Sequence, residues 1–251
     1  MSGGPRSASG RAGAPRSVRE RLIVALDRPD LRAALADVER IGAAVQWYKV
    51  GLQLFSAAGR HAVEALAERG KQAFLDLKLH DIPATVEKAV RALEGLPVSL
   101  LTVHAAGGPE MMRAAAEAAH SLSAKPRVLG VTILTSLDGS ELSALWNPAT
   151  GLEEKVLWLA HACEEAGLDG VVASPQELTP LRLEHDPPFL IVTPGIRGPG
   201  DSARDQKRTL PLAEALARGA DYVVVGRPVL ESKDPQAVVA AYEASLAHLS
   251  I

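Results

Sequence analysis

The sequence predicts an α/β fold, a single-domain (β/α)8 TIM barrel. Three observations support this prediction. A chain of 251 residues is long enough for one barrel of this kind. Short apolar runs alternate with segments of helical periodicity from about residue 21 onward, which indicates parallel strands joined by crossover helices. Polar residues follow most of the apolar runs, as expected where strand ends converge on one face.

The apolar runs place the elements in order along the chain. Strands are expected at Leu22–Leu26, Gln46–Val50, Ala73–Leu77, Ser99–Val103, Arg127–Leu134, Gly170–Ala173, Phe189–Val192 and Tyr222–Val225. Helical periodicity between them predicts helices that include Leu31–Ile41, Arg60–Arg69, Ala84–Leu93 and Glu110–His120. The longer connection from Thr135 to Asp169 predicts an added loop or turn above the barrel mouth. A doubly wound open sheet is the alternative fold for the same alternation.

Residues 1–19 are predicted to form a disordered tail, which leaves residues 20–251 as the barrel domain. The tail is rich in Gly, Ala, Ser, Pro and Arg and lacks an apolar cluster. It has no apolar segment typical of a secretory signal, and its resemblance to an organellar transit peptide is weak. We therefore expect a cytoplasmic protein.

Composition excludes several classes of partner. A net charge of −3 offers no basic surface for nucleic acid, and no apolar run is long enough to cross a membrane. The single cysteine, Cys163, excludes an internal disulfide and a cysteine-based metal cluster. It lies in a helical pattern, where we expect a buried thiol.

The end of the third predicted strand carries three charges within an apolar run: Asp76, Lys78 and Asp81. On a strand, side chains two residues apart point to the same face, so Asp76 and Lys78 are expected to stand about 6–7 Å apart. Buried charge is costly unless it is paired. An Asp-x-Lys-x-x-Asp pattern at a strand end therefore indicates a site of chemistry.

Polar residues at the other strand ends extend this site. In a barrel, all carboxyl ends of the strands meet at one face. The residues at these ends are Asp27, Lys49, His104, Thr135, Ser136, Arg197 and Arg227. Arg197 and Arg227, with Gly226, follow the seventh and eighth strands, where barrels of this type bind phosphate. The polar segment 198–209 is compatible with a lid that closes on the phosphate or with an exposed loop of no function.

These residues also carry a family resemblance. The run Asp76-Leu-Lys-Leu-His-Asp-Ile-Pro-Ala-Thr85 resembles the signature of the orotidine 5′-phosphate decarboxylases. The similarity extends in order from about Arg21 to the C-terminus and departs from the pattern at Ala84, where many relatives have Asn. It includes Ala25-Leu-Asp27, Lys49-Val-Gly51, Leu134-Thr-Ser136, Thr193-Pro-Gly-Ile-Arg197, Asp205-Gln206 and Val225-Gly-Arg227.

The resemblance implies that the enzyme, a carboxy-lyase, converts orotidine 5′-monophosphate to uridine 5′-monophosphate and carbon dioxide. This is the last step of de novo pyrimidine synthesis, and the family uses no metal or organic cofactor. The implied proton donor is Lys78, with Asp76 near the departing carboxylate, where it would keep Lys78 protonated. The resemblance further implies a homodimer in which Asp81 and Thr85 reach the site of the neighbouring subunit.

The remaining substrate contacts follow from the same resemblance. Asp27 and Lys49 resemble ribose ligands, and Thr135 and Ser136 resemble pyrimidine contacts, although Ser136 is equally compatible with a turn. The phosphate ligands would be Arg197, Gln206, Gly226 and Arg227, and Ile82 and Pro194 complete the predicted substrate-binding set. For His80 and His104, a structural role is at least as well supported as a catalytic one.

Three other functions are compatible with a phosphate-binding barrel. A magnesium-dependent lyase or decarboxylase of the same suprafamily would share the Asp-x-Lys-x-x-Asp pattern. An inactive barrel that regulates by binding a phosphorylated ligand or a protein would have no need of the three costly charges. A tryptophan-pathway isomerase would share the glycine region after the eighth strand but lack the run at 76–85.

Overall fold

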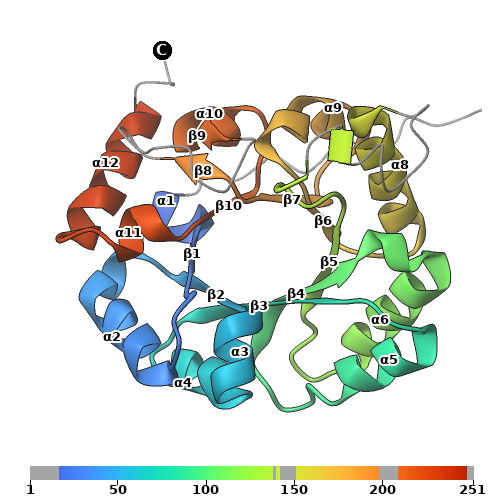
Figure 1. Cartoon of the computed structure of the whole chain (residues 1–251), viewed down its shortest axis with the longest axis horizontal. Helices are drawn as coiled ribbons and strands as arrows, with labels where there is room; N and C mark the ends of the chain where they lie inside the picture. The colour runs from blue at the N-terminus through green and yellow to red at the C-terminus, as the bar shows by residue number, and fades with distance from the viewer. Residues whose placement is uncertain (1–16, 138–139, 142–150, 198–208, 248–251) are drawn as a thin grey trace, which may run out of the picture.

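The computed structural model describes residues 17–137, 140–141, 151–197 and 209–247. Within these residues, eight parallel strands close into a barrel, which confirms the predicted fold (Figure 1). Their order around the barrel is β1-β10-β7-β6-β5-β4-β3-β2. The strands are β1 Leu22–Ala25, β2 Trp47–Gly51, β3 Gln72–Leu79, β4 Val98–His104, β5 Arg127–Val131, β6 Gly170–Val172, β7 Leu190–Thr193 and β10 Tyr222–Val225.

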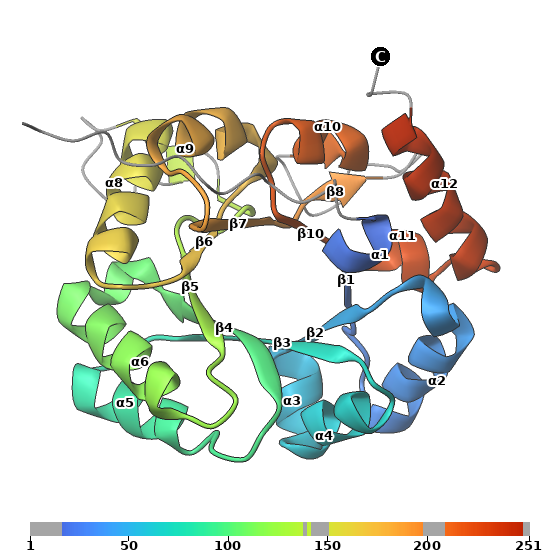
Figure 2. The ribbon, with the colours of Figure 1, turned by 180° about the vertical axis from the view of Figure 1, so that it is seen from behind.

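Helices surround the barrel, as Figures 1 and 2 show from its two ends. None of those in the described residues combines the length and apolarity that a membrane crossing requires. The α-helices are α1 Val18–Arg21, α2 Leu31–Ile41, α3 Leu52–Ala58, α4 His61–Glu68, α5 Pro83–Arg91, α6 Pro109–Ser121, α8 Leu152–Glu165, α9 Leu178–Glu184, α10 Leu212–Ala217, α11 Arg227–Leu230 and α12 Pro235–Ala247. Short 3-10 turns are η1 Gly42–Ala44, η2 Ala105–Gly107 and η3 Pro175–Glu177.

The predicted helix Leu31–Ile41 is confirmed at both ends. The Asp30 carboxylate accepts a hydrogen bond from the Ala33 N–H, and Gly42 ends the helix with φ of +61°. The other three predicted helices are also present, with each end displaced by one or two residues. Helix α3 was not predicted, because seven residues are too few to show a clear period.

Alternation along the strands separates two apolar cores. Residues that face outward pack against the helices and form the larger core. Those that face inward fill the barrel interior: Ile23, Ala25, Phe74, Leu100, Leu129, Leu190, Val192, Tyr222 and Val224. Because side chains two residues apart share a face, Lys49, Asp76 and Thr102 continue these inward-facing rows toward the carboxyl ends of the strands.

The eight barrel strands lie where the sequence predicted them, most with ends displaced by one residue, and there are three larger differences. Strand β5 ends at Val131 rather than Leu134: the Thr132 N–H still donates a hydrogen bond to the Val172 carbonyl oxygen of β6, and a bend follows at Ile133. Strand β3 continues to Leu79, two residues beyond the predicted end, after a register shift against β4 between Leu75 and Leu79. The two-residue strands β8 Ile196–Arg197 and β9 Leu210–Pro211 pair outside the barrel and were not predicted.

Helix α1 begins before residue 20, where the sequence placed the domain boundary. Helix α1 starts at Val18, whose side chain is fully buried and whose N–H donates a hydrogen bond to Glu243 on α12. The composition of the tail could not predict that Val18 is buried, because a single valine produces no periodic pattern. The disorder predicted for residues 1–16 lies outside the described residues.

Candidate active site

A row of alternating charges lies at the carboxyl ends of β1, β2 and β3. Lys78 Nζ lies 2.7 Å from Asp76 Oδ2, and Lys49 Nζ lies 3.4 Å from the same oxygen. Lys49 Nζ also lies 3.3 Å from Asp27 Oδ1. The carboxylate shared by the two lysines is the most enclosed member, with 9% of its side chain exposed. The structure thus brings together four residues that the sequence placed at the ends of three different strands.

Gly51 leaves room for the Asp27–Lys49 pair. A methyl group at this position would stand 2.7 Å from Lys49 Nζ and 3.3 Å from Asp27 Oδ1. These approaches are closer than non-bonded atoms normally allow. The glycine at the end of β2 therefore lets the ammonium group reach both carboxylates.

Thr102 joins the charged row from β4, and no motif in the sequence pointed to it directly. The Thr102 hydroxyl donates a hydrogen bond of 2.9 Å to Asp76 Oδ1 and accepts one of 2.9 Å from the Lys78 N–H. Lys78 has φ of +52°, a left-handed conformation that is uncommon for a residue with a side chain. A fully buried threonine thus fixes both the carboxylate and the strained backbone of the neighbouring lysine.

Paired charges determine the ionisation of Asp76. Burial by itself would raise the pKa of this carboxyl. The charges of Lys49 and Lys78 oppose burial, together with hydrogen bonds from Lys78 and Thr102, and the net effect is to lower the pKa of Asp76 below its ordinary value. The row therefore holds a carboxylate anion between two ammonium groups.

The row forms part of the wall of a cavity of about 900 Å³ at the barrel mouth. Apolar residues form much of the remaining wall, among them Ala25, Phe74, Val131, Ile133, Val172, Ile196 and Val224. The predicted site residues that line it are Asp27, Lys49, Asp76, Lys78, Thr135, Pro194, Arg197, Gly226 and Arg227. The cavity thus combines a charged side, an apolar wall and two arginines, features suited to a phosphorylated molecule with a planar ring.

Four predicted site residues lie outside this cavity in the single chain. Asp81, Ile82 and Thr85 are exposed, and the Asp81 carboxylate accepts a hydrogen bond from the Ile82 N–H. Ser136 occupies an exposed turn, the alternative that the sequence left open. Gln206 and most of the predicted lid lie outside the described residues. The strands β8 and β9 bring the two ends of that segment together.

His80 and His104 lie beside the charged row, with ring centroids 5.5 Å apart. Burial lowers the pKa of His104, and the positive charges of His80 and Lys78 lower it further, against the opposing effect of Asp76. Neither histidine lines the cavity. Among the described residues, the histidines and carboxylates grouped closely enough to hold a metal lie elsewhere, on α8 and after α9.

Comparisons with known proteins agree with this geometry. The profile of the "Orotidine 5′-phosphate decarboxylase / HUMPS family" matches residues 20–242. An orotidine 5′-phosphate decarboxylase from Moorella thermoacetica is 46% identical over 233 residues, which span 91% of this chain and 92% of the relative. One from Rhodopseudomonas palustris is 47% identical over 229 residues, or 91% and 94% of the two chains.

A solved structure gives the same result. The crystal structure of orotidine 5′-phosphate decarboxylase from Lactobacillus acidophilus superposes with a TM-score of 0.78 at 35% sequence identity. The superposition covers 90% of this chain and 99% of the other. The likeness therefore extends through the whole barrel.

Proposed function

The chain belongs to the orotidine 5′-phosphate decarboxylase / HUMPS family, and we propose that it converts orotidine 5′-monophosphate to uridine 5′-monophosphate and carbon dioxide. The observation that carries this proposal is the ammonium group of Lys78, held 2.7 Å from a buried carboxylate beside the cavity at the barrel mouth. The reaction completes de novo pyrimidine synthesis. The cytoplasmic location expected from the sequence stays a prediction.

The proposed chemistry is the replacement of a carboxylate by a proton at carbon 6 of the pyrimidine. The bond between carbon 6 and the carboxylate breaks, carbon dioxide leaves, and the electron pair stays on carbon 6. Lys78 donates a proton from Nζ to that carbon and then regains one from solvent. Its positive charge stabilises the negative charge that develops at carbon 6, so no metal or organic cofactor is needed.

Asp76 has two proposed tasks. It holds the Lys78 ammonium group through the 2.7 Å ion pair and is itself held by Thr102. As an anion beside the departing carboxylate, it repels the substrate's charge in the ground state, and this repulsion is relieved as neutral carbon dioxide forms. Accelerations near 10¹⁷-fold correspond to about 23 kcal/mol, which no single hydrogen bond supplies. Binding energy from the rest of the substrate must therefore contribute.

Three other parts of the cavity would bind the nonreacting groups. Asp27 and Lys49, paired at 3.3 Å, offer an acceptor and a donor to the ribose hydroxyls. Thr135 and Pro194 lie in the cavity wall, where they would contact the pyrimidine, and Ser136 lies in the adjoining turn. Arg197 and Arg227 would bind the phosphate with the Gly226 backbone, and Gln206 would join them from the segment that connects β8 to β9.

We also propose a homodimer with shared active sites. The segment 80–85 is exposed in the single chain, and Ile82 has 66% of its surface accessible. An apolar side chain this exposed beside a charged one is suited to burial against a second subunit. In that arrangement Asp81 would extend the Lys49–Asp76–Lys78 row of the partner subunit, and Thr85 and Ile82 would contact its substrate.

Complementation between two inactive variants tests the shared site. Lys78→Ala and Asp81→Ala are each expected to lose nearly all turnover. When they are mixed under conditions that exchange subunits, mixed dimers contain one site with neither substitution. We therefore expect activity to reappear, up to about a quarter of the wild-type value. If the mixture stays as inactive as its components while subunit exchange is demonstrated, Asp81 serves the site of its own chain.

The direct test of the reaction is ultraviolet absorbance, because orotate and uracil rings absorb differently. The purified protein is expected to decarboxylate orotidine 5′-monophosphate at the same rate with and without a chelator. A folded sample without turnover would refute the assignment. A rate that vanished in chelator and returned with magnesium would favour the magnesium-dependent alternative.

A further inference from the structure

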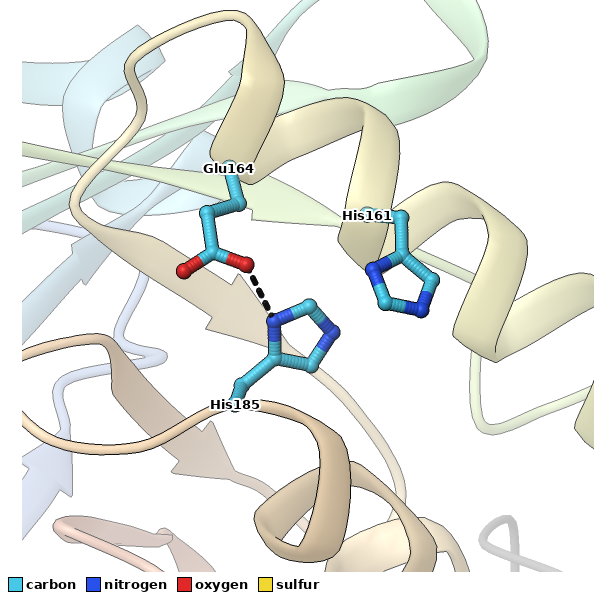
Figure 3. A group of neighbouring side chains, drawn as sticks. All are labelled: His161, Glu164 and His185. Atoms are coloured by element: carbon cyan, nitrogen blue, oxygen red, sulfur yellow. Dashed lines mark hydrogen bonds and ion pairs between the residues drawn. The ribbon is translucent and has the colours of Figure 1, made fainter. Parts of the chain in front are cut away.

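Three side chains of types that can bind a metal, His161, Glu164 and His185, lie close together (Figure 3). None of them lines the active-site cavity. His161 and Glu164 are three residues apart on α8 and therefore share a face of that helix. His185 follows directly after α9. Glu164 and His185 precede β6 and β7, whose opposite ends carry the cavity, so this cluster lies at the N-terminal end of the barrel.

Each histidine in the cluster has one ring nitrogen against a carboxylate. His185 Nδ1 lies 2.7 Å from Glu164 Oε2, and His161 Nε2 lies 2.7 Å from Glu184 Oε2. The two rings approach with centroids 4.7 Å apart, turned toward one another (Figure 3). A histidine that binds a metal commonly gives its second ring nitrogen to a carboxylate, which fixes the tautomer and the ring orientation.

The remaining nitrogen of His185 provides an independent sign of a ligand. Its side chain is 0% exposed, and Nε2 has no hydrogen-bond partner among the described residues. Leaving a buried polar atom unpaired costs about 1–3 kcal/mol. With Nδ1–H donated to Glu164, the Nε2 lone pair points away from the carboxylate and is available to a cation.

The neighbouring residues hold His185 in place. The Phe189 ring stacks on the imidazole with centroids 4.8 Å apart. Arg182 Nη1 donates hydrogen bonds of 3.0 Å to the carbonyl oxygens of His185 and Phe189. The positive charge of Arg182 is itself neutralised by Asp221, at 2.6 Å. One ligand is thus fixed in advance, as a binding site requires.

The other histidine can adjust around it. His161 has 50% of its side chain exposed, so an ion can enter from solvent beside it and its ring can rotate. Candidate ligand atoms of His161, Glu164 and His185 lie within 4.8 Å of one another. Zinc binds histidine nitrogen at about 2.0–2.1 Å, which requires the exposed His161 ring to move inward toward His185, and water can complete the shell.

We propose that His161 Nδ1 and His185 Nε2 bind a zinc ion that joins α8 to the end of α9, while Glu184 and Glu164 hold the second nitrogen of each ring. Two imidazoles with the carboxylates of Glu164 and Glu184 nearby match the charge and the ligand preference of a divalent transition metal. Magnesium prefers an all-oxygen shell and is not expected to bind. The ion would stabilise the base of the barrel and take no part in decarboxylation.

Calorimetric titration of zinc chloride into chelator-treated protein without a histidine tag tests this proposal. We expect one zinc per chain, no binding of magnesium, and a higher melting temperature with zinc. His161→Gln is the informative variant, because His161 is half exposed and its replacement leaves the buried His185 untouched. It should weaken zinc binding at least about tenfold and abolish the increase in melting temperature.

His120→Gln is the matched control, since it removes an exposed histidine from the last turn of α6. It is expected to bind zinc as the wild type does. Wild-type protein that binds no stoichiometric zinc, or a His161→Gln variant that binds it equally well, would overturn the proposal. Turnover should be the same with and without zinc, and a dependence on zinc would contradict the separation of this cluster from the active site.

Discussion

The two ends of the barrel interior are lined by different kinds of side chain. At the N-terminal end, Trp47 and Tyr222 meet edge to face with centroids 5.0 Å apart, and Arg127 donates a hydrogen bond to the Tyr222 hydroxyl. At the carboxyl end, the same inward-facing rows end in Lys49, Asp76 and Thr102, beside a cavity of about 900 Å³. One end is filled with rings, and the other is left open and charged.

This difference shows how one scaffold separates stability from chemistry. The filled end keeps the strands in register through burial, whereas the charged end retains costly groups and a strained lysine backbone that burial elsewhere must offset. Substitutions at the charged end should therefore change activity more than stability. Those at the filled end should do the reverse.

The largest expected effect at the charged end comes from Lys78→Ala. It removes the proposed proton donor, so turnover should fall by at least about 10²–10⁴-fold, the range for loss of a general acid. Circular dichroism and the oligomeric state should be unchanged, because Asp76 keeps its ion pair with Lys49. The exposed Lys88 offers a control, since Lys88→Ala should retain full activity. A Lys78→Ala enzyme with a tenth of normal turnover would show that Lys78 is not the donor.

A smaller effect is expected from Thr102→Val, which keeps the shape of the side chain but removes its hydroxyl. Asp76 then loses a donor, and the Lys78 N–H loses its acceptor. Losing such a bond costs about 1–3 kcal/mol, so kcat should fall about tenfold or more. Thr102→Ser keeps the hydroxyl and should restore most of the activity. Equal kcat values for the valine variant and the wild type would remove Thr102 from the site.

The smallest effect on activity is expected from Gly170→Ala at the start of β6. A methyl group there would overlap the Leu190 carbonyl oxygen on β7. Overpacking of this kind costs about 1–3 kcal/mol, so thermal unfolding should occur several degrees lower while kcat at 25 °C is unchanged. Gly151→Ala is the control, because nothing lies within 4 Å of its added methyl group. A large loss of kcat in Gly170→Ala would show that the two ends are coupled.

Sequence periodicity was sufficient for the barrel and for most of its elements. Apolar runs predicted all eight barrel strands, and the helical periodicity of Leu31–Ile41 predicted both ends of that helix. Alternation also predicted that Asp76 and Lys78 face the same side, and both line the cavity. The left-handed backbone of Lys78 and the register shift in β3 interrupt the regular period of two at that point. Local sequence patterns could not predict α3, the β8–β9 pair or the burial of Val18 at the start of α1. Each of these features is short and is stabilised by contacts with distant parts of the chain.

The sequence by itself determined the barrel and indicated where its charged site lies, because charged residues at the ends of apolar strands are costly unless they are paired. Tertiary structure alone decided how those charges are held. The register shift in β3, the left-handed backbone of Lys78 and the hydroxyl of Thr102 all depend on how β3 lies against β4. The opposition of His161 and His185 likewise depends on the packing of α8 beside the end of α9. Such contacts join residues that are far apart in the sequence, so a local sequence pattern cannot predict them.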